Sequence, residues 1–333
     1  MRRDQLNPHK TATYVMERHK AVYVSVNKAA CTSLKWLVAD LQGEDPERFH
    51  RSLSREVARP MTIHRRSMFR HTPMLHQLPD AELAGIGPDQ GWFVFAVTRH
   101  PSARFFSGWQ SKFLLREPRF MHEHGAEAWI PRVPARTQDV VDEFERFAVA
   151  MAEAPDQRVM RDRHFLSQVT MLAPDRFPYT RIYDTREIPQ LLADLDDHLR
   201  ALGHSGEPPT LMQSNETPLL PLERMFTPAV RAALESLYAD DFATFGYQGL
   251  VPPKADPAQE YAPTLLAEVG RLIDRHERIG DLALRAQSLN ARAKRAKRGK
   301  HPAASRTSPA RRLSVPADGV RWVRGLVRRL ARR

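Results

Sequence analysis

The stretch that most constrains the fold is residues 21–41, AVYVSVNKAACTSLKWLVADL. Residues 21–26 form an apolar, β-branched run, which is typical of a buried strand. Small and hydrogen-bonding residues follow over 27–33. Apolar residues then recur with the spacing of one face of a helix, at Leu34, Leu37, Val38 and Leu41. We expect Thr32 or Ser33 to cap this helix, because a side-chain oxygen there accepts from free backbone N–H groups. The stretch therefore predicts a strand, a loop and a helix in direct succession.

The loop of this unit predicts a phosphate site. A helix N-terminus favours an anion, and Lys28 adds an ammonium group at the same point. The loop is not the Walker A motif GxxxxGK[ST], because it has no glycine and its lysine comes first. Ala29 and Ala30 permit close approach with less curvature, so we expect one terminal phosphate, bound by the Thr32 and Ser33 hydroxyls. Lys28 would lie beside the bond that breaks. An ordinary strand-to-helix turn with a solvated lysine remains the alternative.

A second strand and helix repeat this arrangement. Residues 92–98, WFVFAVT, predict a buried strand, and residues 102–115 predict a helix that follows Pro101. Arg99 follows the strand, and Arg104 and Ser107 lie further along the helix. Ligands of parallel α/β sheets bind beyond the carboxyl ends of the strands. We therefore expect Lys28 and Arg99 to face one crevice and to bind a ligand with two separated phosphates. A helix-capping or ion-paired role for Arg99 is the alternative.

Weaker patterns predict the remaining elements. We expect a brief strand at 61–63 that ends at His64, and another strand at 179–183. Helices are expected at 80–85, 140–153, 188–202 and 229–245. Residues 1–20 are expected to be a polar lead-in, and 116–138 an insertion or acceptor-side loop. Strands that alternate with helices predict an α/β fold with a parallel sheet.

The positive charge of the chain is concentrated at its end. Residues 291–333 carry 15 Lys and Arg against one acid, Asp318, a net charge of +14; the whole chain carries +12, so residues 1–290 carry −2. Residues 263–290 have heptad-like apolar spacing, which predicts a long helix or a short coiled coil that pairs two chains. Residues 321–333 place Trp322 and aliphatic side chains on one helical face among arginines. A disordered basic tail, an anchor on an acidic membrane surface and nucleic-acid binding remain open for 291–333.

These patterns divide the chain into a catalytic domain at 1–250, a helical extension at 251–290, and a basic, largely disordered tail at 291–333 with an amphipathic C-terminal helix. A single cysteine excludes an internal disulfide and a Cys-based metal cluster. No apolar run is long enough to cross a bilayer, and the N-terminus does not resemble a secretory signal. We expect a cytoplasmic protein that is peripheral at the inner membrane surface if its tail binds lipid.

Three motifs together resemble those of sulfotransferase family 2, the carbohydrate sulfotransferases. NKAACTSLK resembles the loop that binds the 5′-phosphosulfate in that family, with Asn27 in place of the usual proline. VTRHPSARFFSGWQSKF is similar to the segment that binds the 3′-phosphate, with Trp109 in place of tyrosine. YADDFATFGY, residues 238–247, is similar to a late motif of the family. The resemblance covers roughly residues 22–247 and does not explain the extension.

The resemblance implies a P-loop-like, three-layer α/β fold and the donor 3′-phosphoadenosine 5′-phosphosulfate (PAPS), with no metal. The implied donor-binding residues of the first loop are Lys28, Ala29, Ala30, Cys31, Thr32 and Ser33. Arg99 and Ser107 would bind the 3′-phosphate. Cys31 is expected to pack the loop rather than act as a nucleophile, because sulfuryl transfer in the family is usually direct and in line.

The acceptor hydroxyl needs a general base, and histidine is the side chain with a pKa nearest working pH. Of the histidines between the two phosphate motifs we favour His64, with His71 second and His76 also in the interval. Residues 164–168 resemble a segment that lies near the acceptor in relatives, and 214–216 are a weaker candidate for a donor-side loop.

The sequence thus predicts a PAPS-dependent sulfotransferase that acts on a carbohydrate or glycolipid hydroxyl. The alternatives are a nucleotide-dependent kinase with an atypical phosphate loop, and a non-enzymatic membrane or nucleic-acid binder. The near-neutral body argues against nucleic acid.

Overall fold

The computed structural model describes residues 1–6, 11–49, 61–212 and 218–298. Four strands form one sheet in the order β1 (Thr13–Met16), β2 (Ala21–Val24), β3 (Phe93–Thr98) and β4 (Arg181–Asp184). β1 pairs antiparallel with β2, whereas β2, β3 and β4 run parallel. The carboxyl ends of β2, β3 and β4 therefore lie along one edge of the sheet, where a ligand site is expected.

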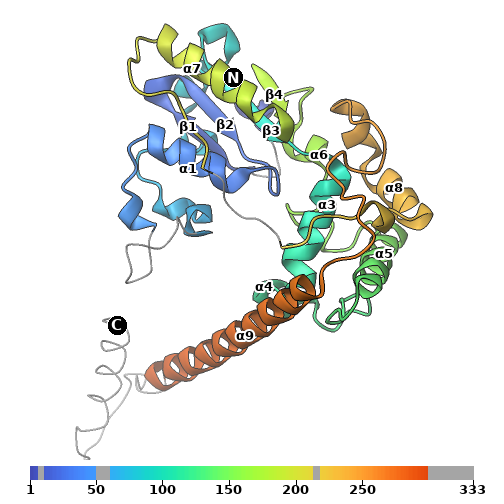
Figure 1. The fold of residues 1–333 in the computed structure, drawn as a ribbon. Helices are drawn as coiled ribbons and strands as arrows, with labels where there is room; N and C mark the ends of the chain where they lie inside the picture. The colour runs from blue at the N-terminus through green and yellow to red at the C-terminus, as the bar shows by residue number, and fades with distance from the viewer. Residues whose placement is uncertain (7–10, 50–60, 213–217, 299–333) are drawn as a thin grey trace, which may run out of the picture.

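Helices cover both faces of this sheet, which gives three layers (Figure 1). On one face, Tyr23, Phe95 and Val97 pack against α1 (Cys31–Leu41) and α7 (Ile188–Ala201). On the other face, smaller strand residues such as Val24 and Ala96 pack against α2 (Asp80–Ala84) and α6 (Gln168–Leu172). β2 and β3 are buried along their whole length, so their sequences are almost continuously apolar rather than alternating. The predicted α/β class with a mostly parallel sheet is confirmed.

A second core, rich in aromatic side chains, forms beside the sheet. It lies between α3 (Pro101–Trp109), α5 (Thr137–Glu153) and α8 (Pro228–Thr244), and Phe105 and Phe144 are among its buried rings. α3 continues into a π-helix, Gln110–Leu114, and α4 (Pro118–His124) follows it. Because α3 also begins at the end of β3, this core fixes the helix that follows Arg99.

The last helix, α9 (Pro263–Arg298), projects from the body (Figure 1). Its first turns bury Leu266, Val269 and Ile273 in the aromatic core. Further along, Leu282 and Leu289 are more than 60% exposed. The predicted long helix is therefore present, with an apolar side that the described residues do not cover. Residues 299–333, which include the predicted amphipathic helix, lie outside the described residues.

Three local predictions were wrong. Residues 13–16, placed in the polar lead-in, form the edge strand β1, because they pair with β2 through a tight turn that has Lys20 at φ 41°. Residues 61–63 are not a strand but part of the 3₁₀-helix Met61–His64. The cap of α1 is Ala30 in a left-handed conformation, without a side-chain hydrogen bond, rather than Thr32 or Ser33.

The other predicted elements are present within a few residues of their expected ends. The strand predicted at 179–183 is β4, two residues later at its start, and the helix predicted at 102–115 is divided between α3 and the π-helix. The predicted insertion at 116–138 contains α4. The candidate donor-side loop at 214–216 lies outside the described residues.

Candidate active site

The loop between β2 and α1 bends without glycine. Lys28 and Ala30 both have left-handed backbone, with φ of 69° and 55°, and Ala29 between them does not. Residues with a Cβ pay roughly 1–2 kcal/mol for that conformation, so two of them in three residues mark a loop whose shape its surroundings impose. Alternation of this kind turns successive N–H groups toward one point and makes an anion-binding concavity. The loop therefore curves more strongly than we expected for a loop without glycine.

Two arginines from the β3–α3 unit brace this loop. Arg99 donates from Nη1 to the Lys28 carbonyl at 3.2 Å, and Arg104 donates from Nε to the Asn27 carbonyl at 3.0 Å. Arg104 is 1% exposed and also donates to the Arg163 carbonyl at 2.8 Å. The structure therefore brings Lys28 and Arg99 together, as predicted. Ser107 is buried one turn beyond Arg104, on the same side of α3.

The site has more cations than anions, and its lysines and Arg99 are buried or partly buried. Burial, followed by the nearby Lys112, lowers the pKa of Lys28 to about 8. Burial likewise lowers the pKa values of Lys35, Arg99 and Lys112. Within the described part of the chain, no carboxylate is ion-paired with Lys28, Lys35 or Lys112. Uncompensated buried charge is costly, so these groups fit a polyanionic ligand.

His64 lies at the first turn of α1, in contact with the loop. Its Nδ1 is 2.9 Å from Lys35 Nζ, and its Nε2 is 2.8 Å from Thr32 Oγ1. Because an ammonium group can only donate, Nδ1 is the acceptor, and Nε2 carries the hydrogen that is donated to Thr32. Burial and then the Lys35 charge lower the pKa of His64 to about 3.

His71, the second candidate base, does not reach the loop. Its backbone N–H donates to Glu44 Oε1 at 2.8 Å, just beyond the opposite end of α1, and its side chain is exposed. Eleven residues of helix separate that end from the loop, which is about 16 Å at 1.5 Å per residue.

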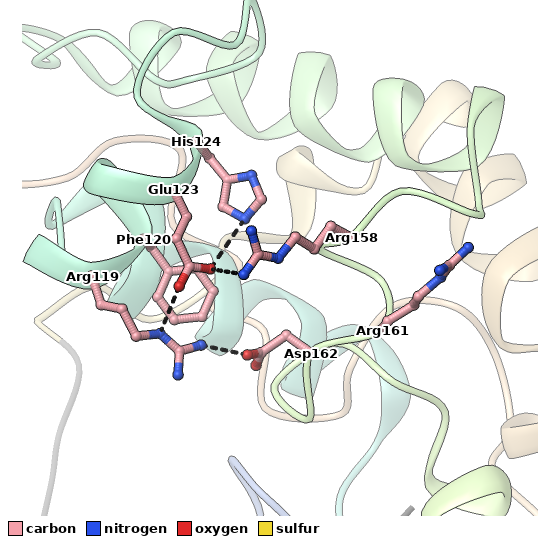
Figure 2. A pocket seen from close by; sticks show the side chains of 7 residues that line it. All are labelled: Arg119, Phe120, Glu123, His124, Arg158, Arg161 and Asp162. Atoms are coloured by element: carbon pink, nitrogen blue, oxygen red, sulfur yellow. Dashed lines mark hydrogen bonds and ion pairs between the residues drawn. The ribbon is translucent and has the colours of Figure 1, made fainter.

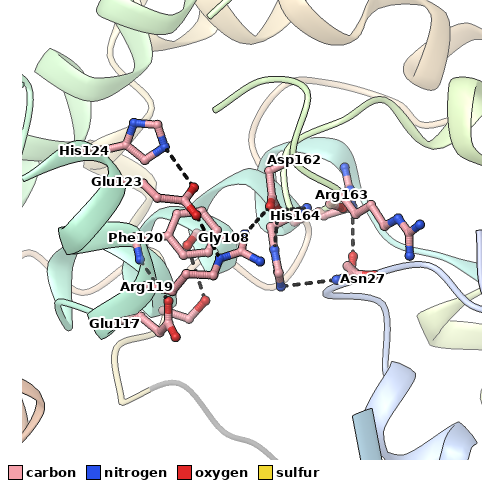
Figure 3. Close-up of polar contacts among 12 residues, drawn as sticks. Asn27, Gly108, Glu117, Arg119, Phe120, Glu123, His124, Asp162, Arg163 and His164 are labelled. Atoms are coloured by element: carbon pink, nitrogen blue, oxygen red, sulfur yellow. Dashed lines mark hydrogen bonds and ion pairs between the residues drawn. The ribbon is translucent and has the colours of Figure 1, made fainter. Parts of the chain in front are cut away.

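Another histidine, His164, lies against the loop (Figure 3). Its Nδ1 is 2.5 Å from Asp162 Oδ1, and its Nε2 is 3.2 Å from Asn27 Nδ2. Burial lowers the pKa of His164 to about 4, although Asp162 opposes this effect. Burial alone would raise the pKa of Asp162, but His164 and Arg119 outweigh it and hold that pKa below its usual value. The residues 164–168 that resemble an acceptor-side segment thus contact the predicted donor loop.

A pocket of about 290 Å³ opens next to this pair (Figure 2). Its lining comprises Arg119, Phe120, Glu123, His124, Arg158, Arg161 and Asp162. Phe120 also packs on His164, with ring centroids 5.8 Å apart, and Lys112 Nζ lies 5.3 Å from the Phe120 ring. Phe120, a residue of the pocket wall, therefore also contacts His164 and lies near Lys112.

The motif at residues 238–247 forms hydrogen bonds that position the start of α6 and the end of β3. Asp241, fully buried on α8, accepts from the Gln168 and Val169 N–H groups and from Ser167 Oγ, at 2.8–2.9 Å. Gln168 in turn pairs with the backbone of Arg99 through both ends of its amide. Tyr247 donates to Thr98 Oγ1 at 2.9 Å. The sequence indicated this motif but not its task, which is to position Arg99.

A mostly parallel sheet, a loop of anion-binding shape beyond the end of β2 and several partly buried cations are the arrangement expected of an α/β protein with an anion site. The family model described as "Sulfotransferase family" matches residues 11–248, so the chain belongs to that family of transferases. The resemblance noted in the sequence is thereby confirmed. Comparison with curated proteins and with solved structures found no match. Within the described ranges, no helix has the length and apolar character needed to cross a membrane.

Proposed function

We propose that this sulfotransferase takes a sulfuryl group from PAPS and transfers it to a hydroxyl of a carbohydrate or glycolipid. The observation that carries the proposal is the glycine-free loop with left-handed backbone at Lys28 and Ala30, beside Arg99 and a Lys28 ammonium that has no carboxylate partner among the described residues. This arrangement provides one phosphate site at the end of β2 and a second at the start of α3. Adenosine 3′,5′-bisphosphate, the desulfated donor, carries phosphates at two such separated positions.

The chain's own residues have distinct tasks in this reaction. Backbone N–H groups of residues 28–33 would bind the 5′-phosphosulfate, with the Thr32 and Ser33 hydroxyls as further donors. Arg99 and Ser107 would bind the 3′-phosphate. Lys28 would neutralise the charge that develops on the phosphate oxygen as its bond to sulfur breaks. The donor supplies the sulfuryl group and a stable leaving group.

A kinase is less well supported. ATP-type loops use glycine to surround a β/γ-phosphate pair, and their magnesium is held in part by a carboxylate near the next strand. In this chain the first residue after β3 is Arg99, and no glycine lies between β2 and α1. Both features favour two single phosphates over a triphosphate.

Thermal unfolding with matched concentrations of adenosine 3′,5′-bisphosphate and of magnesium ATP tests the proposal. A ligand present at 100 times its Kd adds about 2.7 kcal/mol to the stability of the native state. We expect the bisphosphate to raise Tm by several degrees and magnesium ATP to leave it unchanged. Stabilisation by ATP alone would support the kinase instead.

Two roles remain proposals for the extension. Ile279, Leu282 and Leu289 recur along α9 and are 48–64% exposed, and Arg278, Arg285 and Arg292 lie beside them on the helix. This pattern supports either pairing of two α9 helices or contact of α9 and the basic tail with an acidic membrane surface. The second role fits a cytoplasmic protein peripheral at the membrane.

A further inference from the structure

Two histidines contact the predicted donor loop, and their ring nitrogens differ in what they can still do. His64 has both nitrogens engaged, with Lys35 on Nδ1 and Thr32 on Nε2. To accept a proton, it would have to give up Lys35 and become a second cation beside that ammonium, where the two nitrogens now lie 2.9 Å apart. The geometry gives His64 the task of fixing Thr32 and Lys35 at the start of α1.

His164 has the opposite arrangement. Its Nδ1–H donates to Asp162, which leaves Nε2 as a neutral acceptor directed at Asn27, the residue before Lys28 (Figure 3). The contact between Nε2 and Asn27 is 3.2 Å, at the long end for a hydrogen bond. A substrate hydroxyl beside Asn27 can therefore take the place of the Asn27 amide as the hydrogen-bond partner of Nε2. About 20% of the His164 side chain remains exposed, so the side chain is partly accessible to solvent.

We propose that His164 is the group that removes the proton from the acceptor hydroxyl, that Asp162 is its positioning residue, and that the acceptor approaches through the pocket bounded by Phe120 and Asp162. The inference rests on the proposed function and deepens it. It moves the base away from His64, which lies between the two phosphate motifs, to a loop beyond both of them.

The step balances without any further reactant. The acceptor oxygen forms a bond to sulfur while the bond between sulfur and the bridging phosphate oxygen breaks. The electron pair of the broken bond stays on that oxygen, next to Lys28. The acceptor proton moves to His164 Nε2, and Asp162 stabilises the resulting imidazolium through Nδ1–H. The proton passes to water after the product leaves.

The pocket shares two of its lining residues, Phe120 and Asp162, with the surroundings of His164. Phe120 forms part of its wall and packs edge-to-face on His164, with an interplanar angle of 80°. Arg119 is ion-paired with Asp162 at 2.6 Å, and Arg158 approaches Glu123 at 3.5 Å. Arg161, drawn in Figure 2 without a contact to the other lining residues, is exposed and has no ion pair among the described residues. The pocket therefore offers one uncommitted cation to an acceptor.

The test compares His164→Asn with its matched control His64→Asn in the full-length chain. Two quantities are measured for each: the Kd of adenosine 3′,5′-bisphosphate, and the rate of its release from PAPS with water or a mixture of soluble oligosaccharides as acceptor. We expect His164→Asn to release the bisphosphate about 10²–10⁴-fold more slowly than the wild type while its Kd changes little. His64→Asn should instead raise the Kd.

The outcomes are distinguishable. A wild-type chain that neither binds the bisphosphate nor releases it from PAPS refutes the proposed function, and the inference falls with it. If the wild type is active and His164→Asn turns over normally, only the inference is overturned. Loss of bisphosphate binding in His164→Asn would show a structural role and also overturn it. Slow release with intact binding in His64→Asn would return the base to His64.

The position of the hydrogen on the His164 ring can be measured in the active wild-type protein. The ¹⁵N chemical shifts of the His164 ring in the wild-type protein near neutral pH should show hydrogen on Nδ1 and none on Nε2. Asp162→Asn should move hydrogen to Nε2 in part of the population and lower the release rate without a matching change in the Kd of the bisphosphate. A wild-type ring with hydrogen on Nε2 would contradict the proposal.

Discussion

Raising the pH from about 7 to about 9 should weaken the binding of adenosine 3′,5′-bisphosphate roughly tenfold, or ~1.4 kcal/mol. Burial, with Lys112 as the next cause, lowers the pKa of Lys28 to about 8 in the unliganded protein. Such a group is about nine-tenths protonated at pH 7 and about one-tenth protonated at pH 9. A bound anion raises this pKa, so the contribution of Lys28 to affinity is present below pH 8 and is lost as the pH rises through it.

Titration calorimetry of the wild type and of Lys28→Arg across this range is the assay. The ligand's phosphates have their second pKa near 6, so their charge changes little above pH 7. Guanidinium stays protonated throughout, so the affinity of Lys28→Arg should vary much less with pH than that of the wild type. A wild-type Kd that is constant between pH 7 and 9, or an equal slope in both proteins, would refute the assignment of Lys28 to the phosphosulfate.

Three further outcomes are expected. Arg99→Ala should erase the preference of the wild type for adenosine 3′,5′-bisphosphate over AMP, about 10–100-fold, because a charged hydrogen bond to the 3′-phosphate is lost; an unchanged ratio of the two Kd values would exclude that contact. Asp241→Ala should lower the free energy of unfolding in urea by ~3 kcal/mol, because it leaves three buried or partly buried donors at the start of α6 without their acceptor; an unchanged midpoint would contradict the role of the late motif. The full chain should co-sediment with acidic liposomes, and a chain that ends at residue 290 should not; equal sedimentation would remove the membrane role of the tail.

The sequence predicted the parts of the site that lie within continuous patterns. Residues 21–26 and 92–98 are apolar runs, and each is followed by a predicted helix, so their order placed Lys28 and Arg99 at one edge of the sheet before any contact was known. The same reasoning missed β1, which has only three consecutive apolar residues, Tyr14–Met16, within an otherwise polar stretch. The residues of β1 are buried because they pair with β2 and pack against neighbouring core side chains.

The sequence pattern could not identify which histidine is placed to act as the general base. His64 ends a segment whose apolar residues suggested a strand, but a 3₁₀-helix there turns its ring onto Thr32 and Lys35. His164 and Asp162 are two residues apart in an irregular segment, and their relation to Asn27 exists only through tertiary packing. The spacing Asp-x-His was the one local signal that a carboxylate could orient an imidazole. The left-handed backbone of Lys28 and Ala30 had no signal at all, since glycine is the residue that usually marks it.

The most direct test of the account is transfer from PAPS labelled with ³⁵S, in which free sulfate and labelled oligosaccharide or glycolipid products are separated and counted for the wild type and for Lys28→Ala. We expect labelled product and an equal amount of adenosine 3′,5′-bisphosphate from the wild type. We expect neither from Lys28→Ala, although that variant should have an unchanged fold. Full turnover by Lys28→Ala, or release of phosphate from ATP in place of sulfuryl transfer by the wild type, would contradict it.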